Sequence, residues 1–202
     1  MKIIFDLDGT LICSKKRLYE LFVDLLTSDH IDYVTYWNFK FSGINNQDIL
    51  RNQFGYSKFQ VDIFLTDWMK KIESDYYLDM DMIIPGAIRA LEKYSKNNEL
   101  YVCTARQSVT QVHKQLKMLG IFGFFQGIFV TEQKASKEKI LKESGILFSR
   151  NDWLIGDTGH DINAGKKMGI QTCAVLSGFM PATSLSSYSP DLMIQDFTCL
   201  DI

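Results

Sequence analysis

Short apolar runs that alternate with helical patterns constrain the fold of this chain more than any other feature. The runs have the length of buried strands and lie at 2–5, 99–103, 127–130, 153–155, 171–176 and 192–194. The helical patterns lie between or after them, at 85–96, 108–119, 136–144 and 161–168. Because strands that alternate with helices form βαβ units, the sequence predicts an α/β fold with a largely parallel sheet. A polar surface loop is expected at 184–190.

Residues 12–82 interrupt this alternation. They contain apolar residues at helical spacing, among them Leu18, Leu21 and Leu25, and many aromatic residues, but no strand-like pattern of useful length. We therefore expect an all-helical module at 12–82, inserted into a core made of 1–11 and 83–202. The aromatic residues are expected to form the core of the module itself.

The composition argues against several classes of function. Hydrophobic residues make up 46% of the 202 residues and the net charge is −2, so we expect a packed core and no nucleic-acid or membrane partner. The densest basic cluster, Lys15-Lys16-Arg17, is interpreted as a solvated face. Scattered cysteines argue against a disulfide framework or a zinc site, and no signal peptide or membrane span is visible. A cytoplasmic protein is expected.

The first apolar run leads directly into the acidic hexapeptide Asp6-Leu7-Asp8-Gly9-Thr10-Leu11. Ligands of parallel α/β sheets gather at the carboxyl ends of the strands, where these residues are expected. The glycine allows a sharp turn that brings backbone N–H groups toward an anion. One carboxylate can attack phosphorus, and a second can protonate the leaving oxygen and later activate water. The hexapeptide therefore indicates phosphoryl chemistry rather than a plain acidic turn.

Two further polar segments follow later apolar runs. Thr104 comes at the end of one run and is followed by Ala105 and Arg106. A hydroxyl and an N–H group there can hold phosphate oxygens, although a helix N-cap alone explains the threonine better. A lysine after the next run can neutralise charge shared by a phosphate and a carboxylate. Lys137 is preferred because it leads straight into a helical pattern, and Lys134 is the alternative.

The last polar segment is Gly156-Asp157-Thr158-Gly159-His160-Asp161, which follows the apolar run at 153–155. Asp157 is expected at the strand end, and Asp161 lies about one helical turn further, so both can face one pocket. Mg²⁺ prefers oxygen ligands, commonly one or two carboxylates with waters and a substrate phosphate. Asp6 and Asp157, with a backbone carbonyl, are a ligand set of this kind.

In their order and placement, the four segments resemble the haloacid dehalogenase (HAD) superfamily. That family has Asp-x-Asp-Gly-Thr/Ser after the first strand, Thr/Ser after the second, a lysine near a helix start, and Gly-Asp-x-x-x-Asp after a later strand. The first and last motifs match without exception, whereas Ala105 stands where Asn or Gly is common. The resemblance implies a Rossmann-like three-layer core with a helical cap inserted after the first motif.

The resemblance also implies roles for the motif residues. Asp6 would be the nucleophile and Asp8 the general acid and base, while Lys137, or Lys134, would balance their charge. The phosphoryl oxygens would be held by Thr104 and by the region of Gly9 and Ala105, with Arg106 as a candidate substrate contact. Mg²⁺ would be the cofactor, and its expected ligands are Asp6, the backbone carbonyl of Asp8, and Asp157, with Asp161 behind them.

The resemblance leaves several activities open. Members that dehalogenate lack the second aspartate, so Asp8 favours a phosphatase that hydrolyses a small phosphorylated metabolite, nearest to the phosphoglycolate phosphatase-like group. A phosphomutase on the same core and a catalytically silent scaffold are the alternatives. Candidates for substrate specificity in the module are His30, Tyr36, Trp37 and Arg51. A structural role explains each of them more readily. Neither the substrate nor the oligomeric state is predicted.

Overall fold

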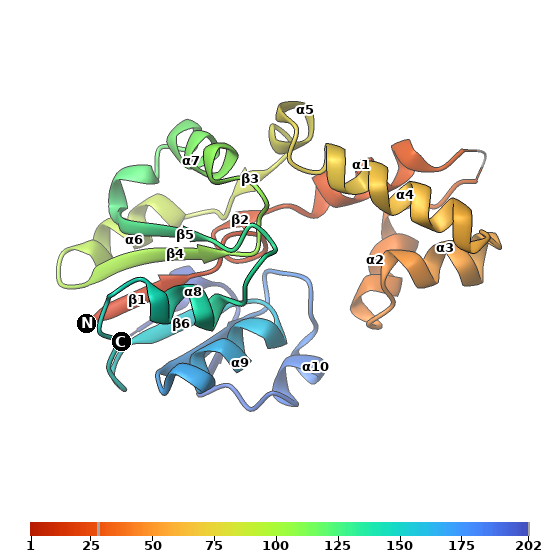
Figure 1. Ribbon diagram of the computed structural model, residues 1–202. Helices are drawn as coiled ribbons and strands as arrows, with labels where there is room; N and C mark the ends of the chain where they lie inside the picture. The colour runs from red at the N-terminus through yellow and green to blue at the C-terminus, as the bar shows by residue number, and fades with distance from the viewer. Residues whose placement is uncertain (28, 202) are drawn as a thin grey trace. The chain divides into compact units, whose positions relative to one another are not determined.

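The computed structural model describes residues 1–27 and 29–201 (Figure 1). The chain divides into two compact units, which we call the core unit, Met1–Cys13 with Met82–Ile202, and the inserted unit, Ser14–Asp81. None of the described helices is long and apolar enough to cross a membrane.

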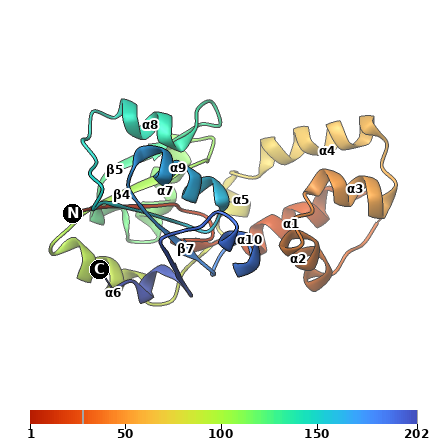
Figure 2. The same ribbon diagram turned by 90° about the horizontal axis from the view of Figure 1, so that it is seen from below.

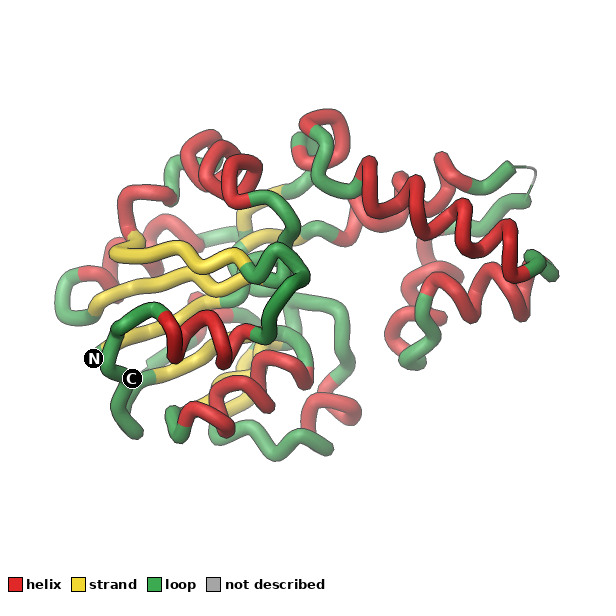
Figure 3. Tube along the Cα trace, in the orientation of Figure 1, coloured by secondary structure: helices red, strands yellow, loops and turns green. Residues whose placement is uncertain are grey.

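The core unit is built on a six-stranded sheet in the order β5-β4-β1-β6-β7-β8, and every neighbouring pair of these strands is parallel (Figure 3). This sheet confirms the predicted α/β fold. The strands are β1 (Lys2–Phe5), β4 (Glu99–Thr104), β5 (Phe125–Val130), β6 (Trp153–Gly156), β7 (Gln171–Val175) and β8 (Leu192–Ile194).

Helices cover both faces of the sheet because successive side chains of a strand point to opposite sides. Ile3 and Phe5 of β1 pack into one hydrophobic cluster with residues of α6 and α7, whereas Ile4 packs into another with residues of α8 and α9. In Figure 2, α8 and α9 lie on one side of the strands and α6 on the other. The core helices are α6 (Ala87–Ser95), α7 (Val109–Met118), α8 (Lys137–Glu143), α9 (Gly159–Met168) and α10 (Ala182–Ser186), with 3₁₀ turns at Phe122–Phe124 and Phe197–Cys199.

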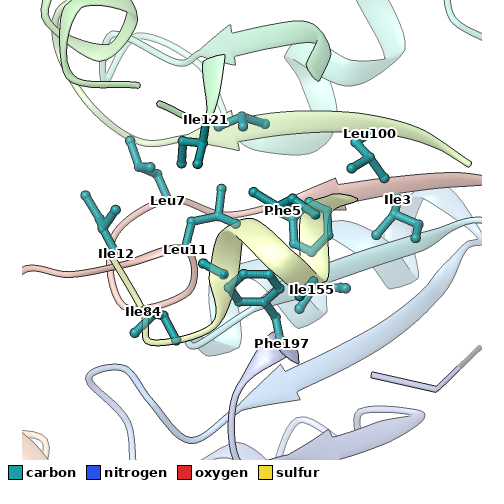
Figure 4. Packing of buried hydrophobic residues seen from close by; sticks show 14 of the residues in the cluster. Ile3, Phe5, Leu7, Leu11, Ile12, Ile84, Leu100, Ile121, Ile155 and Phe197 are labelled. Carbon is teal, nitrogen blue, oxygen red and sulfur yellow. The ribbon is translucent and has the colours of Figure 1, made fainter. Parts of the chain in front are cut away.

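The larger hydrophobic cluster centres on Phe5 (Figure 4). The Phe5 side chain is fully buried and meets the ring of Phe197 edge-on at a centroid distance of 5.4 Å. Burial of one such side chain stabilises a fold by about 1.5–3 kcal/mol. This packing fixes β1 in the middle of the sheet, and with it the acidic segment that follows.

A second, two-stranded antiparallel sheet lies where the core unit's chain leaves and returns. β2 (Ile12–Cys13) pairs with β3 (Met82–Ile83), so that Ile12 lies opposite Ile83 and Cys13 opposite Met82. Strands of two residues carry no readable alternation, which is why the sequence predicted no strand here.

The inserted unit is helical. Its helices are α1 (Lys15–Leu25), α2 (Tyr33–Phe41), α3 (Asn46–Phe54), α4 (Lys58–Lys71) and α5 (Asp75–Leu78). Side-chain N-caps begin three of them, from Asp32, Asn45 and Ser57. The Tyr36 ring packs against Phe22 at a centroid distance of 4.9 Å, so aromatic residues do form the core of this unit.

Two expectations are wrong. Arg17 is not on a solvated face: it is 2% exposed, and it donates hydrogen bonds to Asp81 at 2.9 Å and to the carbonyl of Ile72 at 3.0 Å. The segment 184–190 is not all loop, because α10 extends to Ser186. Leu185 explains this helix, since its side chain is fully buried against Ile162 and Ala174.

Candidate active site

The acidic segments meet at the carboxyl ends of three adjacent strands. β1 lies between β4 and β6, and these strands lead into Asp6, Thr104 and Asp157 respectively. The backbone N–H of Asp6 still donates to the carbonyl of Ile155 at 2.8 Å, so strand pairing continues up to the site. Parallel pairing thus gathers side chains that are far apart in the sequence.

Asp6, Asp157 and Asp161 form a buried carboxylate cluster, in which one oxygen from each lies within 4.8 Å of the others. The ammonium group of Lys137, the first residue of α8, donates to Asp6 and to Asp161, both at 2.5 Å. Two carboxylates therefore contact this ammonium group, and Asp157 adds a third beside them. When all three are ionised, the cluster carries excess negative charge.

Asp161 is fully engaged by its surroundings. One of its oxygens accepts from Lys137, and the other accepts from the backbone N–H and the hydroxyl of Thr158, at 3.1 and 2.6 Å. A Cβ atom at Gly156 would overlap the Asp161 side chain. Both carboxylate oxygens of Asp161 are thus occupied by donors, and one of these donors is Lys137.

Asp157 differs from Asp161 in having one oxygen left over. Its Oδ2 accepts from the backbone N–H of Phe179 at 2.7 Å, whereas its buried Oδ1 has no hydrogen-bond partner among the described residues. Added Cβ atoms at Gly9 and at Gly178 would overlap this carboxylate, so both glycines are needed for close packing. A buried carboxylate oxygen without a donor fits a ligand of a hard divalent cation such as Mg²⁺.

Burial and the neighbouring charges shift the pKa values of the cluster. Burial raises the pKa of Asp6 to about 7; Lys137 opposes this shift, while Asp161 and Asp8 add to it. Burial, with the charges of Asp6 and Asp161, also raises the pKa of Asp157 well above its usual range. Burial alone would lower the pKa of Lys137, but the charges of Asp161 and Asp6 outweigh it and raise the pKa.

Asp8 lies apart from this cluster and faces Arg106. The guanidinium group donates to both carboxylate oxygens, at 2.5 and 2.7 Å, in a fork-like pair. The Arg106 side chain is almost completely buried, Thr104 beside it is 2% exposed, and Ala105 is exposed. Gly9 adopts a positive φ of 84°, which the turn after Asp8 requires.

The two candidate lysines occupy different environments. Lys137 lies in the carboxylate cluster, whereas the side chain of Lys134 is 76% exposed and pairs with Glu132 at 3.5 Å. Of the two, the structure brings only Lys137 to Asp6.

A loop that the sequence motifs did not identify completes the site. The hydroxyl of Ser177 donates to the carbonyl of Gly9 at 2.7 Å, and the loop also supplies Gly178 and the N–H of Phe179 to Asp157. A Ser-Gly pair directly after the apolar run at 171–176 was the available signal.

The four candidates for substrate specificity are divided between the surface and the interior of the inserted unit. His30 and Arg51 are exposed, while Tyr36 and Trp37 are 1% and 4% exposed within the inserted unit's aromatic core. None of the four lies among the residues of the carboxylate cluster.

The core unit is thus an α/β fold with a buried lysine–carboxylate cluster at the carboxyl ends of its parallel strands. A family model described as haloacid dehalogenase-like hydrolase matches residues 3–175, and the chain therefore belongs to this family. The resemblance seen in the sequence motifs is confirmed.

Curated relatives that match nearly the whole chain carry phosphatase names. Pyrophosphatase PpaX of Oceanobacillus iheyensis is 26% identical over 202 residues, covering 96% of this chain and 92% of its own. Phosphoglycolate phosphatase of Aquifex aeolicus is 28% identical over 213 residues, covering 95% and 91%. Together with the family match, these names confirm the prediction of a phosphatase-type enzyme.

Solved structures share the fold. A haloacid dehalogenase-like hydrolase from Streptococcus pneumoniae has a TM-score of 0.73 at 24% identity and covers 96% of this chain and 93% of its own. The HAD hydrolase YfnB of Bacillus subtilis, solved bound to magnesium, has a TM-score of 0.67 at 20% identity, covering 96% and 94%.

Proposed function

We propose that this chain is a Mg²⁺-dependent phosphatase that hydrolyses a small-molecule phosphomonoester through a phosphorylated Asp6. The observation that carries the proposal is the pairing of Asp6 with Lys137 beside the open oxygen of Asp157. A nucleophilic carboxylate and a phosphate repel each other, so a site for this reaction needs positive charge in addition to one lysine.

The residues present fit a magnesium ion. Asp6, Asp157 and the backbone carbonyl of Asp8 would hold it, while Asp161 orients Lys137. When bound, Mg²⁺ supplies positive charge that offsets the charges of the phosphoryl group and of Asp6. The magnesium bound by YfnB is in line with this assignment.

The reaction then proceeds in two balanced steps. A carboxylate oxygen of Asp6 forms a bond to phosphorus as the ester P–O bond breaks, and Asp8 gives a proton to the leaving oxygen. Asp8 next takes a proton from water, which attacks the phosphorus and releases phosphate from Asp6. Thr104 and the backbone N–H groups near Gly9 and Ala105 hold the phosphoryl oxygens.

The pair between Asp8 and Arg106 has a consequence for this cycle. A guanidinium group that pairs with both carboxylate oxygens favours the charged carboxylate over the protonated acid, so the pair opens before Asp8 acts as an acid. The phosphoryl group of a substrate is a competing partner for Arg106, since guanidinium binds phosphate and carboxylate with the same fork.

The test is Mg²⁺-dependent release of inorganic phosphate from p-nitrophenyl phosphate. Wild type and Lys139→Met, which changes an exposed lysine on the same helix as Lys137, are expected to turn over. Asp6→Asn is expected to lose activity by at least about 10³-fold. Full activity in Asp6→Asn would refute the nucleophile. A rearranged phosphoester as the product from a panel of sugar phosphates would instead indicate a phosphomutase.

Inorganic pyrophosphate is a second candidate substrate, because several of the curated relatives are named pyrophosphatase PpaX. The same steps apply, with phosphate as the leaving group in place of an alcohol. Values of kcat/KM for pyrophosphate and for phosphoglycolate, measured side by side with Mg²⁺, decide between a diphosphate and an ester.

A further inference from the structure

Lys40 of the inserted unit carries a partly buried ammonium group with little to balance it. It lies in the last turn of α2 and donates to the side-chain oxygen of Asn46 at 3.1 Å. Tyr36 donates to the same oxygen at 3.2 Å, so two donors share one acceptor. An ammonium group has three N–H bonds, and among the described residues one shared amide oxygen accepts from it.

No carboxylate compensates for this burial. Within the described part of the chain, Lys40 has no ion pair within 4.0 Å. Burial lowers the pKa of Lys40 to about 8, and no neighbouring charge contributes to the shift. A charged group drawn out of water is normally paired, so this position lacks a counter-ion.

The surroundings favour an anion as that counter-ion. The ammonium nitrogen lies 6.0 Å from the centre of the Tyr36 ring, a contact that compensates only weakly for lost water. The C-terminal end of α2 contributes partial negative charge, but Asn46 is the first residue of α3, whose N-terminal end contributes partial positive charge. The two helix ends oppose each other and leave the lysine charge uncompensated.

We propose that the inserted unit binds a small oxyanion, a phosphoryl or carboxylate group, at the ammonium group of Lys40, against Tyr36 and Asn46. The site is formed by residues of the inserted unit alone and does not depend on the reaction proposed for Asp6. The oxyanion is either free phosphate or the anionic group of a larger phosphorylated molecule.

The test follows the side-chain NMR signals of lysine in the full chain, labelled with ¹³C at Cε and carrying Asp6→Asn so that esters persist. Lys40→Arg identifies the Lys40 signal by its loss and retains the charge. Inorganic phosphate and phosphoglycolate are added separately. Saturable movement of the Lys40 signal is expected, with its titration midpoint raised by roughly 1–3 pH units.

The response to each probe identifies the source of the anion. Movement with phosphate assigns the site to the free ion, movement with phosphoglycolate alone assigns it to an ester's anionic group, and an unmoved Lys40 signal with both overturns the proposal. A second measurement compares the phosphate-induced rise in Tm in Lys40→Met and in the control Lys58→Met, which changes an exposed lysine. A smaller rise in Lys40→Met is expected, and equal rises contradict the site.

Discussion

Lys137 in the core unit and Lys40 in the inserted unit are both lysines drawn out of water, in opposite surroundings. Lys137 lies between Asp6 and Asp161, and its pKa is raised. Lys40 meets an amide oxygen and an aromatic ring, and its pKa falls to about 8. Burial acts in the same direction on both, so the neighbouring carboxylates decide the sign. The carboxylate cluster around Lys137 therefore suits a cation, whereas the ammonium group of Lys40 has no carboxylate among the described residues to balance it and suits an anion.

The largest effect is expected from removing the core lysine. Lys137→Met leaves Asp6 and Asp161 buried without their cation, which costs about 3–5 kcal/mol in the free energy of unfolding. Activity on p-nitrophenyl phosphate is expected to fall by about 10²–10³-fold, because the lysine no longer offsets the charge of the reacting groups. Urea unfolding and kcat measurements check both effects against Lys139→Met. Wild-type stability in Lys137→Met would remove the contrast between the two lysines.

An intermediate effect, on the stability of the folded state, is expected from magnesium binding. At about 100 times its Kd, the ion stabilises the folded state by about 2.7 kcal/mol, if it binds only that state. Asp157→Asn should lose most of this gain, because it replaces the open carboxylate oxygen, while Lys40→Met should keep it. Thermal unfolding with Mg²⁺ and with EDTA measures both. An undiminished gain in Asp157→Asn would place the ion elsewhere.

The smallest effect is expected from pH at Lys40. The folded-state pKa of about 8 lies below the ordinary lysine value of 10.5, so between these pH values the unfolded chain holds a proton that the folded chain has lost. Stability from this group therefore rises as pH increases from 8 to 10.5. Lys40→Met should be more stable than wild type at pH 7, by about 1–2 kcal/mol because the group is partly exposed to solvent, with the difference shrinking toward pH 10.5. The difference between the two urea-unfolding curves, followed with pH, is the measurement. A stability difference that stays constant with pH contradicts the lowered pKa of Lys40.

The sheet was predictable because its strands are short, continuous apolar runs that need no tertiary information to recognise. The chemistry-bearing segments follow these strands directly, so parallel pairing alone brings Asp6, Thr104 and Asp157 to one edge. The choice between Lys137 and Lys134 needed the structure, because both follow the same strand and only the start of α8 decides which side chain turns inward.

Other features depend on contacts that no local pattern encodes. Arg17 stands in a basic triplet, and its burial depends on the distant Asp81 and on the carbonyl of Ile72. The role of the loop at 177–179 depends on its approach to Gly9 and Asp157. No sequence pattern distinguishes Lys40, because lysines near the ends of helices are common. Its lack of a counter-ion among the described residues is visible only in the structure.

The short pair of β2 and β3 has a consequence for how the chain can change over evolution. Because Ile12 pairs with Ile83 and Cys13 with Met82, the two ends of the core unit's chain between which Ser14–Asp81 is inserted lie side by side. Closing a loop grows more costly only slowly with its length, by about 0.6 kcal/mol for each doubling. Descendants of this chain can therefore lengthen, shorten or exchange the inserted segment while the strands of the core unit keep their register.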